Sequence, residues 1–181
     1  CFRRNSAIAE PNRLRAETTA RRERRRLGPL SGSAILDVAT FLRRYHRLRV
    51  DFRYGWDDSI SAVLVKLPEP GRSVVGVNAR HPLGRRNFSL AHELGHLALH
   101  HGGSTTGTLD PTLEREADWF VVEFLLPAEL LNSWCAQLGV RGPRELARRS
   151  GLSPTMVRRR FAELGLGPIA RLGLVREYKF H

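Results

Sequence analysis

Four histidines and a glutamate are concentrated in "FSLAHELGHLALHH", residues 88–101, which otherwise reads as an apolar helix. His92, Glu93 and His96 form the pattern His-Glu-x-x-His. Residues four apart lie on one face of a helix, so both imidazoles can reach one ion at about 2.0–2.1 Å. Glu93 lies about 100° round the helix from His92, where a carboxylate can take a proton from an activated water. The spacing therefore predicts a metal-dependent hydrolytic site.

The other histidines of this stretch do not complete the site. In a continuous helix His100 lies two turns from His92, about 12 Å along the axis, so the two cannot bind one ion. The metzincin pattern also fails, because it requires glycine and histidine where the sequence has Leu99 and Gly102. We expect His100 and His101 to interact with the helix dipole or to line the cleft. The third ligand must come from elsewhere.

The segment "LEREADWF" is the best source of that ligand. In helical projection Glu114 falls within the apolar arc and Asp118 at its edge, while the competing Glu116 points about 100° away, towards expected solvent. A carboxylate on a buried face needs a partner, and a metal ion is one. We therefore favour Glu114 as ligand, Asp118 as the acid that holds a ligand histidine's other nitrogen, and Glu116 as a surface acid.

The surrounding elements must position these groups. Periodicity predicts a helix over residues 33–48, capped by Ser33, and two strands in "ISAVLVKL" and "SVVGVNA" that "PEPGR" joins as a hairpin. Asn87 or Ser89 is expected to cap the histidine helix. The next helix is expected to begin at Asp110 and Pro111, and Pro127 is expected to end it.

The last part of the chain is expected to be helical. A helix around "AELLNSWCAQLG" precedes "PRELARRSGLSPTMVRRRFAELGLG", which reads as a helix, a tight turn at Gly151–Pro154 and a second helix. Taken alone, the second segment would pass for a DNA-binding helix-turn-helix with Arg158–Arg160 as its basic face. The tail "IARLGLVREYKF" is a candidate strand.

Composition sets further bounds. The chain has 181 residues, enough for one domain with a proper core, and a formal net charge of +12 that comes almost entirely from arginine. Contact with nucleic acid or acidic partners and a coding bias towards arginine explain this charge equally well. Two cysteines make no disulfide framework, and no apolar run approaches the roughly 18 residues of a membrane span. Residues 1–30 are expected to be a basic, disordered arm, with a nucleic-acid-binding arm as the alternative, and the protein to be cytoplasmic.

At this point the chain resembles the ImmA/IrrE-type metallopeptidases. The resemblance lies in "RRNFSLAHELGHLALH", "EREADWFVVEFLLP" and "ELARRSGLSPTMVRRRFAELGL", and covers roughly residues 33–166. It implies an α+β fold: a zincin-like core with a small antiparallel sheet, a His-Glu-x-x-His helix and a Glu-x-x-x-Asp helix, followed by a helix-turn-helix-like segment. The expected domains are an arm (1–30), the metallopeptidase domain (31–140), and the helix-turn-helix-like segment and tail packed on it (141–181).

The resemblance also implies site roles. His92, His96 and Glu114 would bind zinc, with manganese as a possibility in the family, and Glu93 would be the general base. Asp118 occupies a position where asparagine is frequent in the family. Aspartate can also hold the non-ligating nitrogen of a ligand histidine. The methionine usual before Pro127 is absent, which is a packing detail.

The expected substrate is a helix-turn-helix transcriptional repressor, whose cleavage relieves repression in bacterial stress response or mobile-element regulation. Weak or no direct nucleic-acid binding is expected. The rival interpretation is a DNA-binding transcriptional regulator with a peptidase-like scaffold. The oxyanion of a peptidase reaction needs a further donor, and the candidates in this sequence are Tyr45, His46, Tyr54, His81 and His100.

Overall fold

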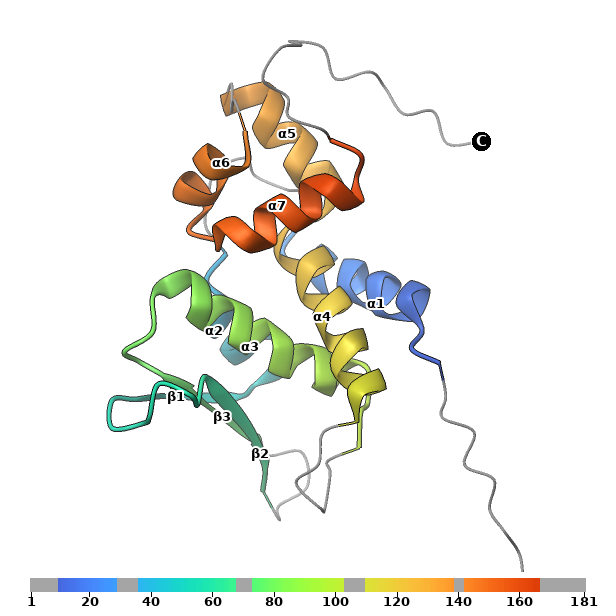
Figure 1. Ribbon diagram of the computed structural model, residues 1–181. Helices are drawn as coiled ribbons and strands as arrows, with labels where there is room; N and C mark the ends of the chain where they lie inside the picture. The colour runs from blue at the N-terminus through green and yellow to red at the C-terminus, as the bar shows by residue number, and fades with distance from the viewer. Residues whose placement is uncertain (1–9, 29–35, 68–72, 103–109, 139–141, 167–181) are drawn as a thin grey trace, which may run out of the picture.

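The computed structural model describes residues 10–28, 36–67, 73–102, 110–138 and 142–166, in which helices pack beside a small sheet (Figure 1). The elements follow in the order α1 (Arg13–Arg25), α2 (Val38–His46), β1 (Arg49–Arg53), β2 (Ala62–Lys66), β3 (Ser73–Asn78), α3 (Leu83–Ala98), α4 (Pro111–Leu125), α5 (Ala128–Leu138), α6 (Pro143–Ser150) and α7 (Pro154–Glu163). This mixture of helices and one small sheet is the predicted α+β class.

The sheet has the strand order β1-β3-β2 and is mixed. The predicted hairpin is confirmed, because β2 pairs antiparallel with β3 and Leu64 lies opposite Val75. The expectation of a purely antiparallel sheet is wrong, since β1 joins the other side of β3 in parallel and places Val50 opposite the same valine. The strand β1 has only five residues, in which Val50 and Phe52 alternate with charged residues, and only Val50 is buried.

The ends of the helices follow the predictions in part. Asp110 caps α4 by accepting from the Thr112 amide, and α4 ends at Leu125, before Pro127, as predicted. The predicted caps of α3 are wrong, because α3 begins at Leu83, and Asn87 and Ser89 lie inside it. The Asn87 side chain donates instead to the Leu36 carbonyl, and the Ser89 hydroxyl to the carbonyl one turn back. The helix α2 begins after Asp37, and Ser33 lies outside the described residues.

The expectation of a disordered arm is wrong for residues 13–25, which form α1. This helix lies along α4 (Figure 1), with Ala16 and Ala20 fully buried between the two. The two alanines let the helices approach closely, while Arg15 and Arg21 of α1 pair with acids of α4. Two small residues among many arginines give a weak periodic signal, so only the packed partner reveals the helix.

Gly95 sets the distance between α3 and α4. A Cβ atom added at this position would lie 3.2 Å from Cδ1 of Phe120 and 3.4 Å from Cα of Ala117, both in α4. Such contacts are tighter than side chains normally make, so a glycine on α3 lets α4 pack directly over the two histidines. The glycine of the His-Glu-x-x-His segment therefore brings the second helix within reach of the site.

The helices α6 and α7 form the predicted helix, tight turn and helix. Gly151 takes a left-handed conformation with φ 65° in the turn, which lies against the start of α3, where a Cβ on Gly84 would be 2.0 Å from the Gly151 carbonyl oxygen. The predicted basic face is wrong in one member, because Arg160 is buried and bound to Glu123 of α4. The candidate strand in the tail lies outside the described residues.

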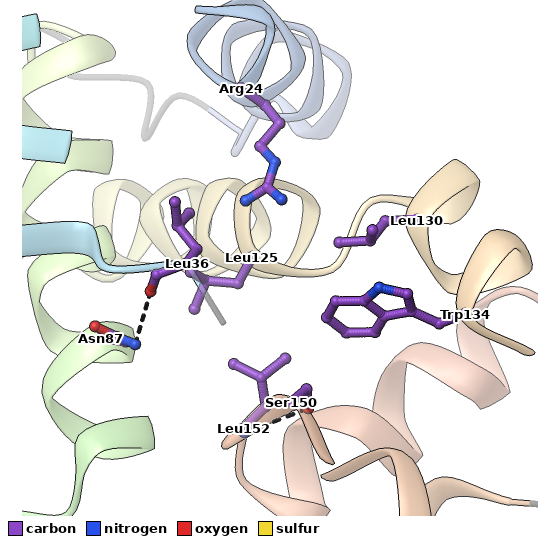
Figure 2. Close-up of a pocket in the computed structure, with 8 residues that line it drawn as sticks. All are labelled: Arg24, Leu36, Asn87, Leu125, Leu130, Trp134, Ser150 and Leu152. Atoms are coloured by element: carbon purple, nitrogen blue, oxygen red, sulfur yellow. Dashed lines mark hydrogen bonds between the residues drawn. The ribbon is translucent and has the colours of Figure 1, made fainter. Parts of the chain in front are cut away.

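A small cavity lies where α1, α4, α5 and the α6–α7 turn meet. Figure 2 shows the Arg24 guanidinium pointing towards it, with Leu152 and Ser150 facing it from below and Trp134 at one side. Nε of Arg24 and Nε1 of Trp134 are buried and have no hydrogen-bond partner among the described residues. The space holds about one water molecule. In the described parts of the chain, no helix is long and apolar enough to cross a membrane.

Candidate metal centre

Three side chains from α3 and α4 converge on one point. Nε2 of His92 and Nε2 of His96 lie 3.1 Å apart, and the Glu114 carboxylate lies 3.1 Å from each of them. The two histidines are one turn apart on α3, and Glu114 is in the first turn of α4, directly after its Asp110 cap. Among the described residues these three form the group of side chains that could hold a metal ion.

The geometry of the three donors fits a metal ion. For bonds of about 2.0–2.1 Å, neighbouring donors of a tetrahedral ion lie about 3.3 Å apart. The two nitrogens are 3.1 Å from each other, and each is 3.1 Å from its nearer Glu114 oxygen, so the separations are close to that value. Two imidazole nitrogens and one carboxylate oxygen are also a donor set that zinc binds in hydrolases. The three side chains are partly exposed, His92 and His96 at 19% and Glu114 at 30%, so a further position remains open to a substrate or a water.

Glu93 lies beside this group on α3. Burial raises the pKa of its carboxyl, and the nearby Glu114 carboxylate raises it further, while the charge of His92 and a hydrogen bond from the Leu64 backbone oppose the shift. The net effect is a pKa above the ordinary value. A raised pKa makes a carboxylate a better proton acceptor at neutral pH, which suits a general base.

Asp118 lies behind His92. Its carboxylate is 3.4 Å from Nδ1 of His92, on the side of the ring away from Glu114. Burial opposes a charge on His92, but Asp118, Glu114 and Glu93 outweigh burial and raise the pKa of the ring. Asp118 is thus one turn after Glu114 and within ion-pair distance of the outer nitrogen of His92, although this buried nitrogen has no hydrogen-bond partner among the described residues. Its role in holding the ring stays a prediction.

The burial of the two glutamates of α4 is the reverse of the prediction. Glu116, expected at the surface, has a side chain only 5% exposed, whereas Glu114 is at the open edge of the site. The projection assumed one buried face, but α4 is covered by α3 on one side and by α1 on another. Glu116 points into the junction of these helices.

His101 is the residue that the sequence pattern missed. The helix α3 ends at Ala98, and His100 takes a left-handed conformation with φ 55° that leaves it exposed and turns His101 back. Nδ1 of His101 lies 2.9 Å from Nδ1 of His96, and Nε2 lies 3.1 Å from Glu116. The only available signal was a second histidine directly after the helix, which does not specify a direction.

The contacts described for the five candidate oxyanion donors lie outside the three converging side chains. His46 bonds to Glu23, Nε2 of His81 faces the Asp58 carbonyl, and Tyr45 packs against Phe41. Tyr54 and His100 are exposed. Among the described residues none of the five makes a hydrogen bond, ion pair or ring contact with the three converging side chains, and a role for any of them stays a prediction.

Comparisons with known proteins indicate a family and a fold. The family described as Peptidase_M78, IrrE N-terminal-like domain, matches residues 35–162. Among solved structures, a Mycobacterium tuberculosis transcriptional regulator is similar, with a TM-score of 0.59 and 20% sequence identity. The match covers 81% of this chain and 46% of that one, so the chain spans less than half of the regulator's length. At this identity the likeness shows a common fold. A search of curated proteins gave no match.

Proposed function

The chain belongs to the Peptidase_M78 (IrrE N-terminal-like) family, and on this premise we propose that it is a zinc-dependent endopeptidase that cleaves a helix-turn-helix repressor. One observation carries the proposal: Nε2 of His92 and Nε2 of His96 lie 3.1 Å apart and each lies 3.1 Å from a Glu114 carboxylate oxygen, with the partly buried carboxylate of Glu93 on the same helix as the two histidines. His92, His96 and Glu114 would hold the ion, with zinc favoured over manganese by the two imidazoles.

The chemistry divides between the ion and the protein. When bound, the ion supplies Lewis-acid polarisation of the scissile carbonyl and lowers the pKa of water. Glu93 takes the proton from the attacking water and returns it to the leaving amine. The burial that raises the pKa of Glu93 serves both steps, because the protonated form must also persist long enough to donate. Asp118 fixes the ring of His92 through its outer nitrogen.

The edge strand β2 gives a polypeptide substrate a place to bind. In the described residues β2 pairs only with β3, and the backbone of Leu64 in β2 bonds to Glu93, so this edge faces the catalytic carboxylate. Val63 and Val65 are exposed on the same strand. An extended peptide aligned along β2 would pair with its free backbone groups and pass over the site. This favours an unfolded or extended segment of the repressor as the point of cleavage.

A DNA-binding regulator on the same scaffold is the alternative. It is supported by the net charge of +12 and by the exposed Arg158 and Arg159 on α7. Burial of Arg160 against Glu123 weakens it, because one third of the basic face is committed to the core. Salt-dependent binding to the chain's own promoter that is unchanged in Glu93→Gln would favour this alternative.

The proposal is tested with Glu93→Gln, which keeps the three donors and removes the base. We expect the purified variant to bind one equivalent of zinc, as the wild type does, and to lose cleavage of the repressor encoded beside it, measured by mass spectrometry of the fragments. Glu10→Gln, at an exposed position, is the matched control. A wild-type protein that binds no zinc above background would overturn the proposal, and cleavage by Glu93→Gln at the wild-type rate would remove Glu93 as the base.

A further inference from the structure

A chain of contacts runs from the metal centre to the start of α1. Nδ1 of His96 lies 2.9 Å from Nδ1 of His101, whose Nε2 lies 3.1 Å from Oε2 of Glu116. The backbone amide of Asn12 donates to Oε1 of Glu116 at 2.8 Å, and Arg15 donates to Oε2 at 3.2 Å. Every link is within hydrogen-bond distance, and the links join α3, α4 and α1.

We propose that Glu116 and His101 are positioning residues that select the tautomer of His96, and that the start of α1 holds them in place. The proposal rests on the metal site of the proposed function. It concerns residues at unspecified positions of the two patterns: Glu116 lies between Glu114 and Asp118 on α4, and His101 follows the His-Glu-x-x-His helix.

The direction of the hydrogen bonds follows from chemistry. A carboxylate only accepts, so Nε2 of His101 carries the hydrogen and donates it to Glu116. A neutral imidazole has one N–H, which leaves Nδ1 of His101 as an acceptor. Nδ1 of His96 must then be the donor in the contact between the rings. Its other nitrogen, Nε2, is left with a free lone pair directed at His92 and Glu114, and this is the form that can bind a metal ion.

Burial makes this arrangement rigid. The side chains of Glu116 and His101 are 5% and 3% exposed, so water does not compete for their hydrogen bonds. The outer contact of His92 is looser, since its Asp118 partner is 44% exposed and 3.4 Å away. The two ligand histidines are therefore held unequally, and His96 has the more enclosed support.

The element that secures Glu116 lies outside the family domain. The match to the family begins at residue 35, whereas Asn12 caps α1 and Arg15 lies in its first turn. Arg15 also donates to the carbonyl of Leu99, at the turn that directs His101 towards His96. The start of α1 thus contacts both Glu116 and the turn at Leu99 that precedes His101. Its docking therefore helps to hold Glu116 and His101, of which His101 contacts His96.

Two nearly isosteric variants separate the proposed role from simple packing. His101→Asn keeps a hydrogen-bond acceptor near the position of Nδ1, while His101→Leu removes it. We expect His101→Leu to weaken zinc binding by about 10–100-fold, the usual effect of losing an outer partner of a ligand histidine. His101→Asn should recover most of this loss, and Arg15→Met should show a smaller loss of the same sign. Zinc affinity is measured by competition with a chromophoric chelator.

The tautomer itself is read without metal or activity. Long-range proton–nitrogen NMR spectra of the metal-free protein, labelled at histidine nitrogen, should show His96 protonated at Nδ1 in the wild type and a mixture of tautomers in His101→Leu. A wild-type His96 protonated at Nε2 would overturn the inference, as would equal zinc affinities in the Leu and Asn variants. A wild type that binds no zinc would overturn the proposed function instead, and the NMR result would still decide the tautomer.

Discussion

The two ends of α4 each carry a paired glutamate, with different partners and different burial. At its start, Glu114 faces two histidines at a partly open edge, with its side chain 30% exposed. Near its end, Glu123 is 1% exposed and bound by two arginines, Arg21 of α1 and Arg160 of α7. The difference is in the partners, because guanidinium groups saturate a carboxylate, whereas imidazole nitrogens with free lone pairs leave it able to bind an ion.

The partners of an acid distinguish a metal-binding position from a structural ion pair. A buried acid paired with arginines joins helices and has no coordination to offer. An acid among histidines keeps a pair of electrons available and lies where substrate can reach it. Glu116 combines both kinds of partner, since Arg15 pairs with it on one side and His101 on the other.

The largest effect is expected from Glu114→Ala. One of three donors is lost, so zinc affinity should fall by more than the roughly 10–100-fold that follows from losing an outer partner. The metal-free fold should persist, because Glu114 is partly exposed and close to the acid Glu93. Equilibrium dialysis with zinc and thermal unfolding of the metal-free protein measure the two quantities. Retention of a full equivalent of tightly bound zinc would contradict the expectation.

Glu123→Ala should have the reverse profile. It leaves buried Arg160 with only the more distant carboxylate of Glu163, at 3.5 Å, and breaking a buried pair costs about 3–5 kcal/mol of stability. Zinc binding per folded molecule should remain that of the wild type, because Glu123 is at the far end of α4. Urea unfolding followed by circular dichroism gives the stability. A loss of zinc affinity without a loss of stability would refute the distinction between the two ends.

Arg24→Met is expected to stabilise the protein. Burial lowers the pKa of Arg24 to about 10, so the folded state disfavours its charge. Among the described residues its Nε has no partner, and its Nη1 donates only a long hydrogen bond of 3.4 Å to the Phe124 carbonyl. Methionine fills the space beside Leu125 and Trp134 (Figure 2) without a buried charge, so we expect a gain of about 1 kcal/mol. Arg25→Met, at an exposed neighbouring position, is the control, and melting temperatures compare the two. A lower melting temperature for Arg24→Met would show that the arginine has a stabilising partner.

The smallest effect concerns acid pH. Burial alone would raise the pKa of Glu23, but the hydrogen bond from His46 and the charges of Arg26 and Arg22 outweigh it and lower the pKa below its ordinary value of 4.5. A lowered pKa means that the contribution to stability is complete above pH 4.5 and is lost as the pH falls through the folded-state value. The stability difference between wild type and Glu23→Gln should therefore shrink as the pH is lowered from 6 to 3. A difference that stays constant over this range would exclude the effect.

The sequence alone predicts those features that depend on a few neighbouring residues. The hairpin, the Asp110 cap, the turn at Gly151 and the face shared by His92 and His96 each follow from a short pattern of residues. The reach of Glu114 to the histidines was favoured by projection alone, although its burial was misjudged. These features depend on periods and caps that operate within one or two turns of chain.

The tertiary structure decided the rest. The helix α1 is stabilised by two alanines packed on a helix about a hundred residues away, and no local pattern reveals that partner. Burial of Glu116 follows from the docking of α1, and the inward turn of His101 follows from a left-handed residue at His100. Sequence therefore determined which residues can bind a metal ion, through their types and spacing. Only the packing of distant helices determined which buried side chains hold those residues in place. Burial and hydrogen-bond partners depend on contacts between segments that are far apart in the chain.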